Sequence, residues 1–187
     1  MHALLNPAHG ALVLVDYQAR LMPVMQHAEA VLREAAFVAQ VAQALHVPTV
    51  VTEQTPDKLG PTVAPLAAYA AQPLVKHDFN AVRAGLLQRL GRQQPQLREV
   101  VVAGCEAHVC LLQTALGLKQ AGYAVHVVVG ACASRWAHDQ HLAQQRLLQA
   151  GVNLVSGEMV AFEWLGSAQH PAFSALIPQI KARIPPP

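Results

Sequence analysis

One stretch of sequence decides the fold, Val100-Val101-Val102-Ala103-Gly104-Cys105-Glu106-Ala107-His108-Val109-Cys110. Its first four residues are uninterruptedly apolar, as expected for a strand buried on both faces of a parallel sheet. The residues that follow, 111–120, predict a helix, so Cys110 lies at a strand-to-helix turn. Backbone N–H groups converge at such a turn and the helix dipole is positive there, which favours a thiolate and suits an oxyanion. A cysteine in this position is, by itself, more often a small buried residue than a nucleophile.

The alternation of strand and helix continues on both sides of this stretch. Strands are expected at 11–15, 48–52, 74–76, 99–103, 124–129 and 152–155, with helices at 28–46, 63–69, 81–90, 107–120, 139–150, 158–165 and 173–182. Uninterrupted alternation of this kind is typical of an open α/β sandwich with right-handed crossovers. We therefore predict a single domain over residues 1–187, a three-layer α/β/α sandwich with a six-stranded parallel sheet of Rossmann-like order 3-2-1-4-5-6.

Composition limits the possible classes of protein. A hydrophobic content of 53% with 13% charged residues indicates a globular protein with a substantial core. The net charge is only +2 and the 13 basic residues are scattered, so neither nucleic acid nor a membrane is expected as a partner. The three cysteines form no disulfide spacing pattern, which predicts a cytoplasmic location.

Three polar residues follow strands of the predicted sheet. Asp16 closes the first strand, Lys76 closes the third and Cys110 follows the fourth. Ligands of open parallel sheets bind at the carboxyl ends of the strands where the strand order reverses, and there the first and fourth strands are neighbours. A carboxylate, an ammonium and a thiol in one cleft make a nucleophile with its base and a cation. Taken singly, Asp16 is better explained as a turn cap and Lys76 as a solvated lysine, and we expect both outside the core.

At these positions the chain resembles the isochorismatase-like cysteine hydrolases, a family that includes nicotinamidases and N-carbamoylsarcosine amidases. The resemblance extends over nearly the whole chain. The segments at 157–163 and 170–173 are most similar to the subgroup of small hydrolases typified by the isochorismatase domain-containing proteins. The residues that carry the resemblance lie at 15–18, 52–60, 75–80, 104–110, 157–163 and 170–173.

The resemblance implies a cysteine hydrolase that cleaves a C–N bond of a small amide-type substrate. In that mechanism Asp16 takes the proton of Cys110, Lys76 holds both groups in position, and Cys110 forms a thioester that water hydrolyses. The backbone N–H groups of Glu106 and Cys110 form the oxyanion hole, with a cis peptide bond between Cys105 and Glu106. The walls of the substrate pocket are expected in the loops around Gln18, Leu21, Gln54, Phe79 and His108.

No metal or other cofactor is expected. Nicotinamidases of the family bind a metal through an Asp-x-His pair and a further histidine after the second strand, whereas this chain has no histidine in residues 53–58. None of the ten histidines has a ligand-like spacing. The chain departs from the family at Asn80, where serine is usual, and at Gly130, where aspartate is frequent. Cys110 argues against true isochorismatase activity, because the enzymes that cleave that vinyl ether lack the cysteine.

Two other functions compete with the hydrolase. One is a binding or redox protein of the same fold, in which Cys110 is oxidised reversibly and no amide is cleaved. The other, a dinucleotide-binding protein, is disfavoured because residues 16–20 after the first strand contain no glycine-rich turn. The apolar residues within 159–165 and the family resemblance together favour a homo-oligomer.

Overall fold

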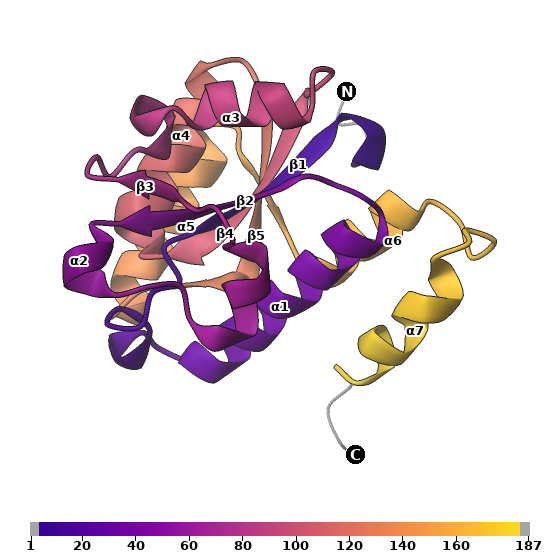
Figure 1. Cartoon of the computed structure of the whole chain (residues 1–187), viewed down its shortest axis with the longest axis horizontal. Coiled ribbons are helices and arrows are strands. Elements are labelled where there is room, and N and C mark those ends of the chain that lie inside the picture. Colours follow the sequence, from indigo (N-terminus) through magenta and orange to yellow (C-terminus); the bar gives the residue numbers. More distant parts are fainter. Residues whose placement is uncertain (1–3, 184–187) are drawn as a thin grey trace.

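The computed structural model describes residues 4–183. Residues 1–3 and 184–187, the two ends of the predicted 1–187 domain, lie outside this range. Within the described residues, six parallel strands form one sheet in the order β3-β2-β1-β4-β5-β6 (Figure 1). Helices cover both faces of the sheet, so the predicted fold class and strand order are confirmed.

The elements follow the predicted alternation closely. The strands are β1 (Gly10–Val15), β2 (Thr49–Gln54), β3 (Leu74–Lys76), β4 (Glu99–Cys105), β5 (Ala124–Ala133) and β6 (Asn153–Val155). The α-helices are α1 (Ala28–Ala44), α2 (Pro56–Leu59), α3 (Leu86–Gln93), α4 (Leu112–Gln120), α5 (Ala137–Gln149), α6 (Gly157–Leu165) and α7 (Phe173–Lys181). Short helical turns are η1 (Pro7–His9), η2 (Met22–Val24), η3 (Ala64–Tyr69), η4 (Ala81–Ala84) and η5 (Ala107–Leu111).

The differences from the prediction lie in the fifth strand and in several helices. The strand expected at 124–129 continues to Ala133, so Gly130 lies within β5. The segment expected as a helix at 63–69 is the 3₁₀ turn η3. The helix expected at 81–90 is divided into η4 and α3 by Gly85, whose φ of 95° is left-handed and interrupts the helix. The helix expected from residue 107 begins with the wider π turn η5, which contains Cys110, before α4 continues it. Turns of this kind are set by tertiary contacts, and apolar periodicity does not distinguish them from α-helix.

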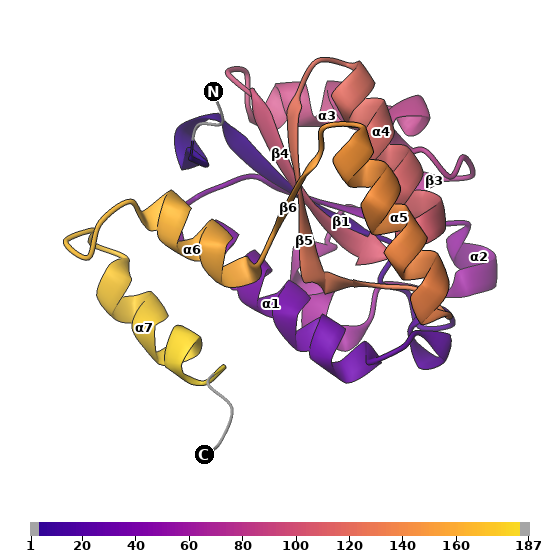
Figure 2. The same ribbon diagram turned by 180° about the vertical axis from the view of Figure 1, so that it is seen from behind.

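Two hydrophobic clusters hold the layers together, one on each face of the sheet. Helices α1, α6 and α7 contribute to the first cluster, and α3 and α4 to the second (Figures 1 and 2). All six residues of β1 are buried, with Leu12 and Leu14 in the first cluster and Val13 and Val15 in the second. A strand with apolar side chains on both faces is the property that predicted a parallel sheet.

A glycine brings the two central strands together at their carboxyl ends. Gly104 of β4 pairs with Val15 of β1, and a Cβ atom at Gly104 would lie 2.4 Å from the carbonyl oxygen of Val15. Only glycine allows this approach. As a result Asp16, which follows Val15, lies beside the start of the turn that carries Cys110.

Candidate active site

Asp16 and Lys76 meet at the carboxyl edge of the sheet. The Lys76 Nζ atom lies 2.7 Å from Asp16 Oδ2, and the Thr52 hydroxyl donates a 2.6 Å hydrogen bond to Asp16 Oδ1. The thiol of Cys110 interacts with both members of this ion pair. The predicted juxtaposition of the three groups is therefore present in the structure.

The expectation that Asp16 and Lys76 lie outside the core is wrong. Asp16 is 0% exposed and Lys76 is 1% exposed. Each charge is neutralised by the other, and Thr52 and Gln54 add hydrogen bonds to Asp16 and Lys76, which is the condition for burying an ion pair. Asp16 follows β1, which is central in the sheet, whereas Lys76 ends the edge strand β3 and its side chain reaches inward to Asp16 and Gln54.

Asp16 also has an unusual backbone conformation. Its φ is 57°, in the left-handed region that aspartate and asparagine enter more readily than most residues. The chain turns sharply there, and Gln18 donates its backbone N–H to the Asp16 carbonyl oxygen at 2.9 Å. The turn leaves the Asp16 side chain at the end of the strand, where Lys76 reaches it.

The thiol form of Cys110 is favoured in the resting protein. Burial, and after it the negative charge of Asp16, raise the pKa of Cys110 to about 12, although the charge of Lys76 lowers it. The turn was expected to favour the thiolate, but the surroundings of Cys110 favour the thiol, because desolvation outweighs the effect of the cation. A nucleophile of this pKa needs a base that removes its proton during attack, and the neighbouring carboxylate of Asp16 is such a group.

Gln54 and Gln18, both expected in the pocket walls, form a hydrogen-bonded chain that ends at Lys76. The Gln54 Oε1 atom accepts a 2.6 Å hydrogen bond from Lys76 Nζ and lies 4.0 Å from the Cys110 sulfur. The side-chain amide of Gln18 binds the backbone N–H and carbonyl of Gln54 at 2.8 and 3.1 Å, and the carbonyl of Gly60 at 2.7 Å. Both glutamines are buried, so the structure uses Gln18 to hold the backbone in place and Gln54 to contact the ion pair.

The turn that precedes Cys110 is tied to the connection between β5 and α5. The peptide bond between Cys105 and Glu106 is cis, as predicted. The Glu106 carboxylate pairs with Arg135 at 2.6 Å, and His108 Nδ1 lies 2.9 Å from the hydroxyl of Ser134. Sequence reasoning missed Ser134 and Arg135, although their place after the carboxyl end of a parallel strand was a usable signal.

Thr52 was missed for a different reason. It is the last predicted residue of the second strand, and the register of β1 against β2 places it opposite Val15, next to Asp16. That register depends on the packed sheet. Once it is known, a hydroxyl at this position is an evident partner for the carboxylate.

The remaining predicted pocket residues lie in loops around the ion pair. Leu21 precedes η2 after β1, and it is partly buried. Phe79 follows β3, and it is 52% exposed. The backbone carbonyl of Phe79 accepts a long hydrogen bond from Thr114 of α4 at 3.5 Å. The contact of Leu21 and Phe79 with a substrate stays a prediction.

The two departures from the family have structural partners. The Asn80 side chain accepts from the backbone N–H of Val82 at 2.9 Å and packs on α4, where a Cβ at Gly117 would lie 2.6 Å from its amide nitrogen. Asn80 therefore anchors the loop after β3 to the helix that follows Cys110. Gly130 lies against Glu34 of α1, and a Cβ there would be 3.3 Å from Glu34 Cγ, so this position belongs to the packing of α1.

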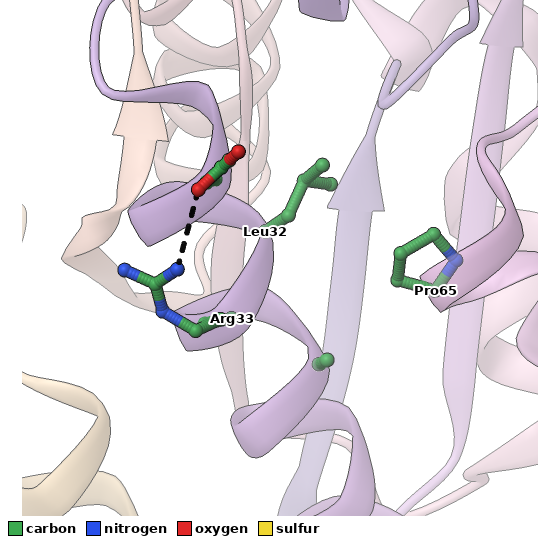
Figure 3. Close-up of a pocket in the computed structure, with 5 residues that line it drawn as sticks. Leu32, Arg33 and Pro65 are labelled. Atoms are coloured by element: carbon green, nitrogen blue, oxygen red, sulfur yellow. Dashed lines mark ion pairs between the residues drawn. The ribbon is translucent and has the colours of Figure 1, made fainter.

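A separate groove lies on the outside of α1. It has a volume of about 300 Å³ between α1 and η3, and the Glu29–Arg33 ion pair of 3.7 Å borders it (Figure 3). Its other lining residues are Leu32, Ala36 and Pro65. Across residues 4–183, no three His, Cys, Asp or Glu side chains cluster as a metal site, and no helix is long and apolar enough to span a membrane.

Comparison with known proteins agrees with this arrangement. The model of the isochorismatase domain matches residues 10–159, which is most of the chain and includes all three reactive groups. The chain belongs to the isochorismatase family. Isochorismatase domain-containing protein 2 of Bos taurus is 41% identical over 179 residues, which cover 96% of this chain and 86% of the relative.

Solved structures of the isochorismatase fold superpose well on the chain. The MAR1 ribonuclease of Caenorhabditis elegans has a TM-score of 0.90 at 32% identity, with 98% of this chain and 95% of that chain covered. A pyrazinamidase/nicotinamidase of Streptococcus mutans has a TM-score of 0.67 at 21% identity, with 78% of this chain and 99% of that chain covered. The second likeness concerns the fold alone.

Proposed function

We propose that this protein is a metal-independent cysteine hydrolase that cleaves the C–N bond of a small amide-type substrate through a thioester on Cys110. The observation that carries the proposal is the buried ion pair of Asp16 and Lys76 beside the Cys110 thiol. A cation and a carboxylate beside a cysteine, in a fold of this family, are the groups that nucleophilic catalysis at a carbonyl carbon requires.

The proposed reaction has two steps. Asp16 takes the proton of Cys110 as the sulfur attacks the carbonyl carbon, and Lys76 stabilises the negative charge that develops on the sulfur. The backbone N–H groups of Glu106 and Cys110 hold the oxyanion. When the C–N bond breaks, the leaving amine takes the proton from Asp16. Water, deprotonated by Asp16, then attacks the thioester and releases the acid and the thiol.

The test is a panel of small amides assayed by ammonia release, with Cys110→Ala as the control. We expect turnover of at least one amide by the wild-type chain, none by Cys110→Ala, and an acyl adduct on Cys110 in rapidly quenched samples. A sulfenic acid on Cys110, with no acyl adduct and no turnover across the panel, would instead support the redox protein of the same fold.

A second candidate function is RNA cleavage, favoured by the relative from Caenorhabditis elegans that is described as a ribonuclease. The charges of this chain do not favour it: the net charge is +2, Lys76 is paired with Asp16, and Arg135 is paired with Glu106. Incubation with single-stranded RNA should therefore leave the RNA intact. Cleavage that is lost in Cys110→Ala would replace the amide proposal.

We also propose that the chain works as a homo-oligomer of single-domain subunits in the cytoplasm. The support for assembly is an apolar surface on α6, where Met159 and Phe162 are 47% and 45% exposed, and Leu4 near the same edge is 74% exposed. The support for the cytoplasm is that Cys105, Cys110 and Cys132 are all free thiols. Light scattering at micromolar concentration that finds only a 20.0 kDa species would contradict the oligomer.

A further inference from the structure

Lys76 has two acceptors in the buried site, and only one of them carries a charge. Its Nζ atom donates to Asp16 Oδ2 at 2.7 Å and to Gln54 Oε1 at 2.6 Å. An ammonium has three N–H donors, so one remains free to face the Cys110 sulfur. The amide oxygen of Gln54 also lies 4.0 Å from that sulfur, so the Gln54 amide contacts both the Lys76 ammonium and the Cys110 thiol.

The orientation of the Gln54 amide is determined by its surroundings. Its nitrogen donates to the carbonyl oxygen of His77 at 2.8 Å, which leaves the oxygen directed at Lys76. Its backbone is held on both sides by the Gln18 side chain, which is itself bonded to Gly60. A side chain with both amide atoms engaged inside the protein is poorly placed to be a substrate contact and well placed to orient a neighbour.

We propose that Gln54 is a positioning residue, which holds the Lys76 ammonium aimed at Cys110. This inference rests on the proposed function for its importance in turnover, but it concerns the free protein and can be tested without a substrate. A buried ammonium is stabilised by every acceptor bonded to it, because hydrogen bonds to the charged form favour that form. Without the Gln54 acceptor, Lys76 keeps only its bond to Asp16 and is free to turn away from Cys110, whose sulfur then loses the nearby cation.

The experiment measures the rate at which iodoacetamide, a neutral reagent, alkylates Cys110 in the free protein. The variants are Gln54→Met, which removes the acceptor at similar length, and Gln54→Glu, which keeps an acceptor but adds a charge. The matched control is Gln140→Met, since Gln140 also donates to a backbone carbonyl, that of Cys132 at 3.0 Å, away from the ion pair. Thermal unfolding of each variant reports whether it is folded.

We expect Gln54→Met to be alkylated about tenfold more slowly than the wild type, the change in thiolate population that follows a one-unit rise in pKa. Gln140→Met should react at the wild-type rate. If an amide substrate is found, Gln54→Met should lower kcat and leave KM nearly unchanged. Alkylation of Gln54→Met at the wild-type rate, or a higher KM with normal kcat, would show that Gln54 is a substrate contact and would overturn the proposal.

The Gln54→Glu variant keeps the proposal testable if Gln54→Met does not fold. At pH 8 the added carboxylate beside Cys110 should slow alkylation by at least the same factor. As the pH falls towards 6, its protonation should return a neutral acceptor, and the ratio of the variant rate to the wild-type rate should rise towards one. The titratable groups that face this position are Asp16, Lys76 and Cys110, and all are present in both proteins. His77 contacts Gln54 through its backbone carbonyl, and its ring Nδ1 lies 3.2 Å from the Thr55 hydroxyl. A rate ratio of one at pH 8, or one that does not change with pH, would overturn the proposal.

Discussion

At the scale of the residue, the ion pair of Asp16 and Lys76 decides how substitutions should behave. Both side chains are fully buried and bonded to each other, so removing either charge leaves the other unpaired in the protein interior. We therefore expect the activity of the site and the stability of the fold to depend on the same two residues. In a site built of exposed polar groups, by contrast, a substitution can lower activity without a large loss of stability.

The substitution Asp16→Asn should show both consequences. Turnover should fall by about 10²–10⁴-fold, the usual value of a general base. The free energy of unfolding should also fall, by about 3–5 kcal/mol, because Lys76 loses its counter-charge. Asparagine tolerates the left-handed backbone at this position, so the backbone itself adds little strain. The measurements are amide turnover and thermal unfolding.

The double substitution Asp16→Asn with Lys76→Met is the control for Asp16→Asn. It should recover part of the lost stability because no buried charge is left unpaired, while turnover stays low. Wild-type turnover in Asp16→Asn would exclude Asp16 as the base.

The reactivity of Cys110 gives a second prediction at this scale. Iodoacetamide should label Cys110 ahead of Cys105 and Cys132, because Cys110 is the most accessible of the three and lies beside a cation. Its labelling rate should increase with pH above neutrality, since the pKa is raised to about 12. Lys76→Met should raise that pKa further and slow the labelling, as Lys76 lowers it in the wild type. Thiolate absorbance against pH, with circular dichroism as the folding check, provides the measurement, and a titration that Lys76→Met does not change would contradict this role.

At the scale of the element, the approach of β1 and β4 places Asp16 beside the turn that carries Cys110. Gly104→Ala would put a Cβ atom 2.4 Å from the carbonyl oxygen of Val15, so the strands must separate at their carboxyl ends. We expect a loss of about 1–3 kcal/mol or more, the cost of overpacking a core, together with a loss of turnover as Asp16 moves away from Cys110.

Gly91 provides the matched control for Gly104. It lies within α3, and a Cβ atom there would meet nothing within 4 Å. Gly91→Ala should therefore stabilise the protein by about 0.5–1 kcal/mol through helix propensity, with turnover unchanged. Chemical denaturation and turnover of the two variants make the comparison. A Gly104→Ala protein that is as stable and as active as Gly91→Ala would show that the site does not depend on the close approach at Gly104.

At the scale of the whole molecule, buried thiols and a buried phenol make the stability of the fold depend on pH. Burial is the largest cause that raises the pKa of Cys105, Cys110, Cys132 and Tyr17 above their ordinary values. A group whose pKa is raised in the folded state contributes stability, and this contribution is complete at pH values below its pKa in the unfolded state. For cysteine the unfolded pKa is about 8.5. That stability is lost as the pH rises from there towards the pKa in the folded state, which is about 12 for Cys110 and Cys132 and higher for Cys105.

We therefore expect the thermal unfolding temperature to be insensitive to these groups at pH 7–8 and to fall steadily between pH 9 and 11. Cys132→Ala removes one of the groups, whose pKa burial raises to about 12, and should make the decline shallower. Unfolding temperatures measured in a series of buffers check this. A stability that rises through the same pH window would contradict the sign of these shifts.

The sequence by itself determined the architecture and the identity of the reactive groups. The apolar runs that form β1 and β4, and the helices between them, follow from burial patterns that each segment carries locally. The parallel sheet, its order and the positions of Asp16, Lys76 and Cys110 at strand ends could be predicted for that reason. The family resemblance added their roles and the cis peptide bond before Glu106.

Only the tertiary structure decided how those groups are surrounded. The pairing of Val15 with Thr52 and of Gln54 with Lys76 depends on the register of separate strands, which no local pattern specifies. That register buries the ion pair and makes Gln54 its second acceptor. Burial raises the pKa of the Cys110 thiol, because desolvation depends on everything packed around a group and not on its neighbours in the chain.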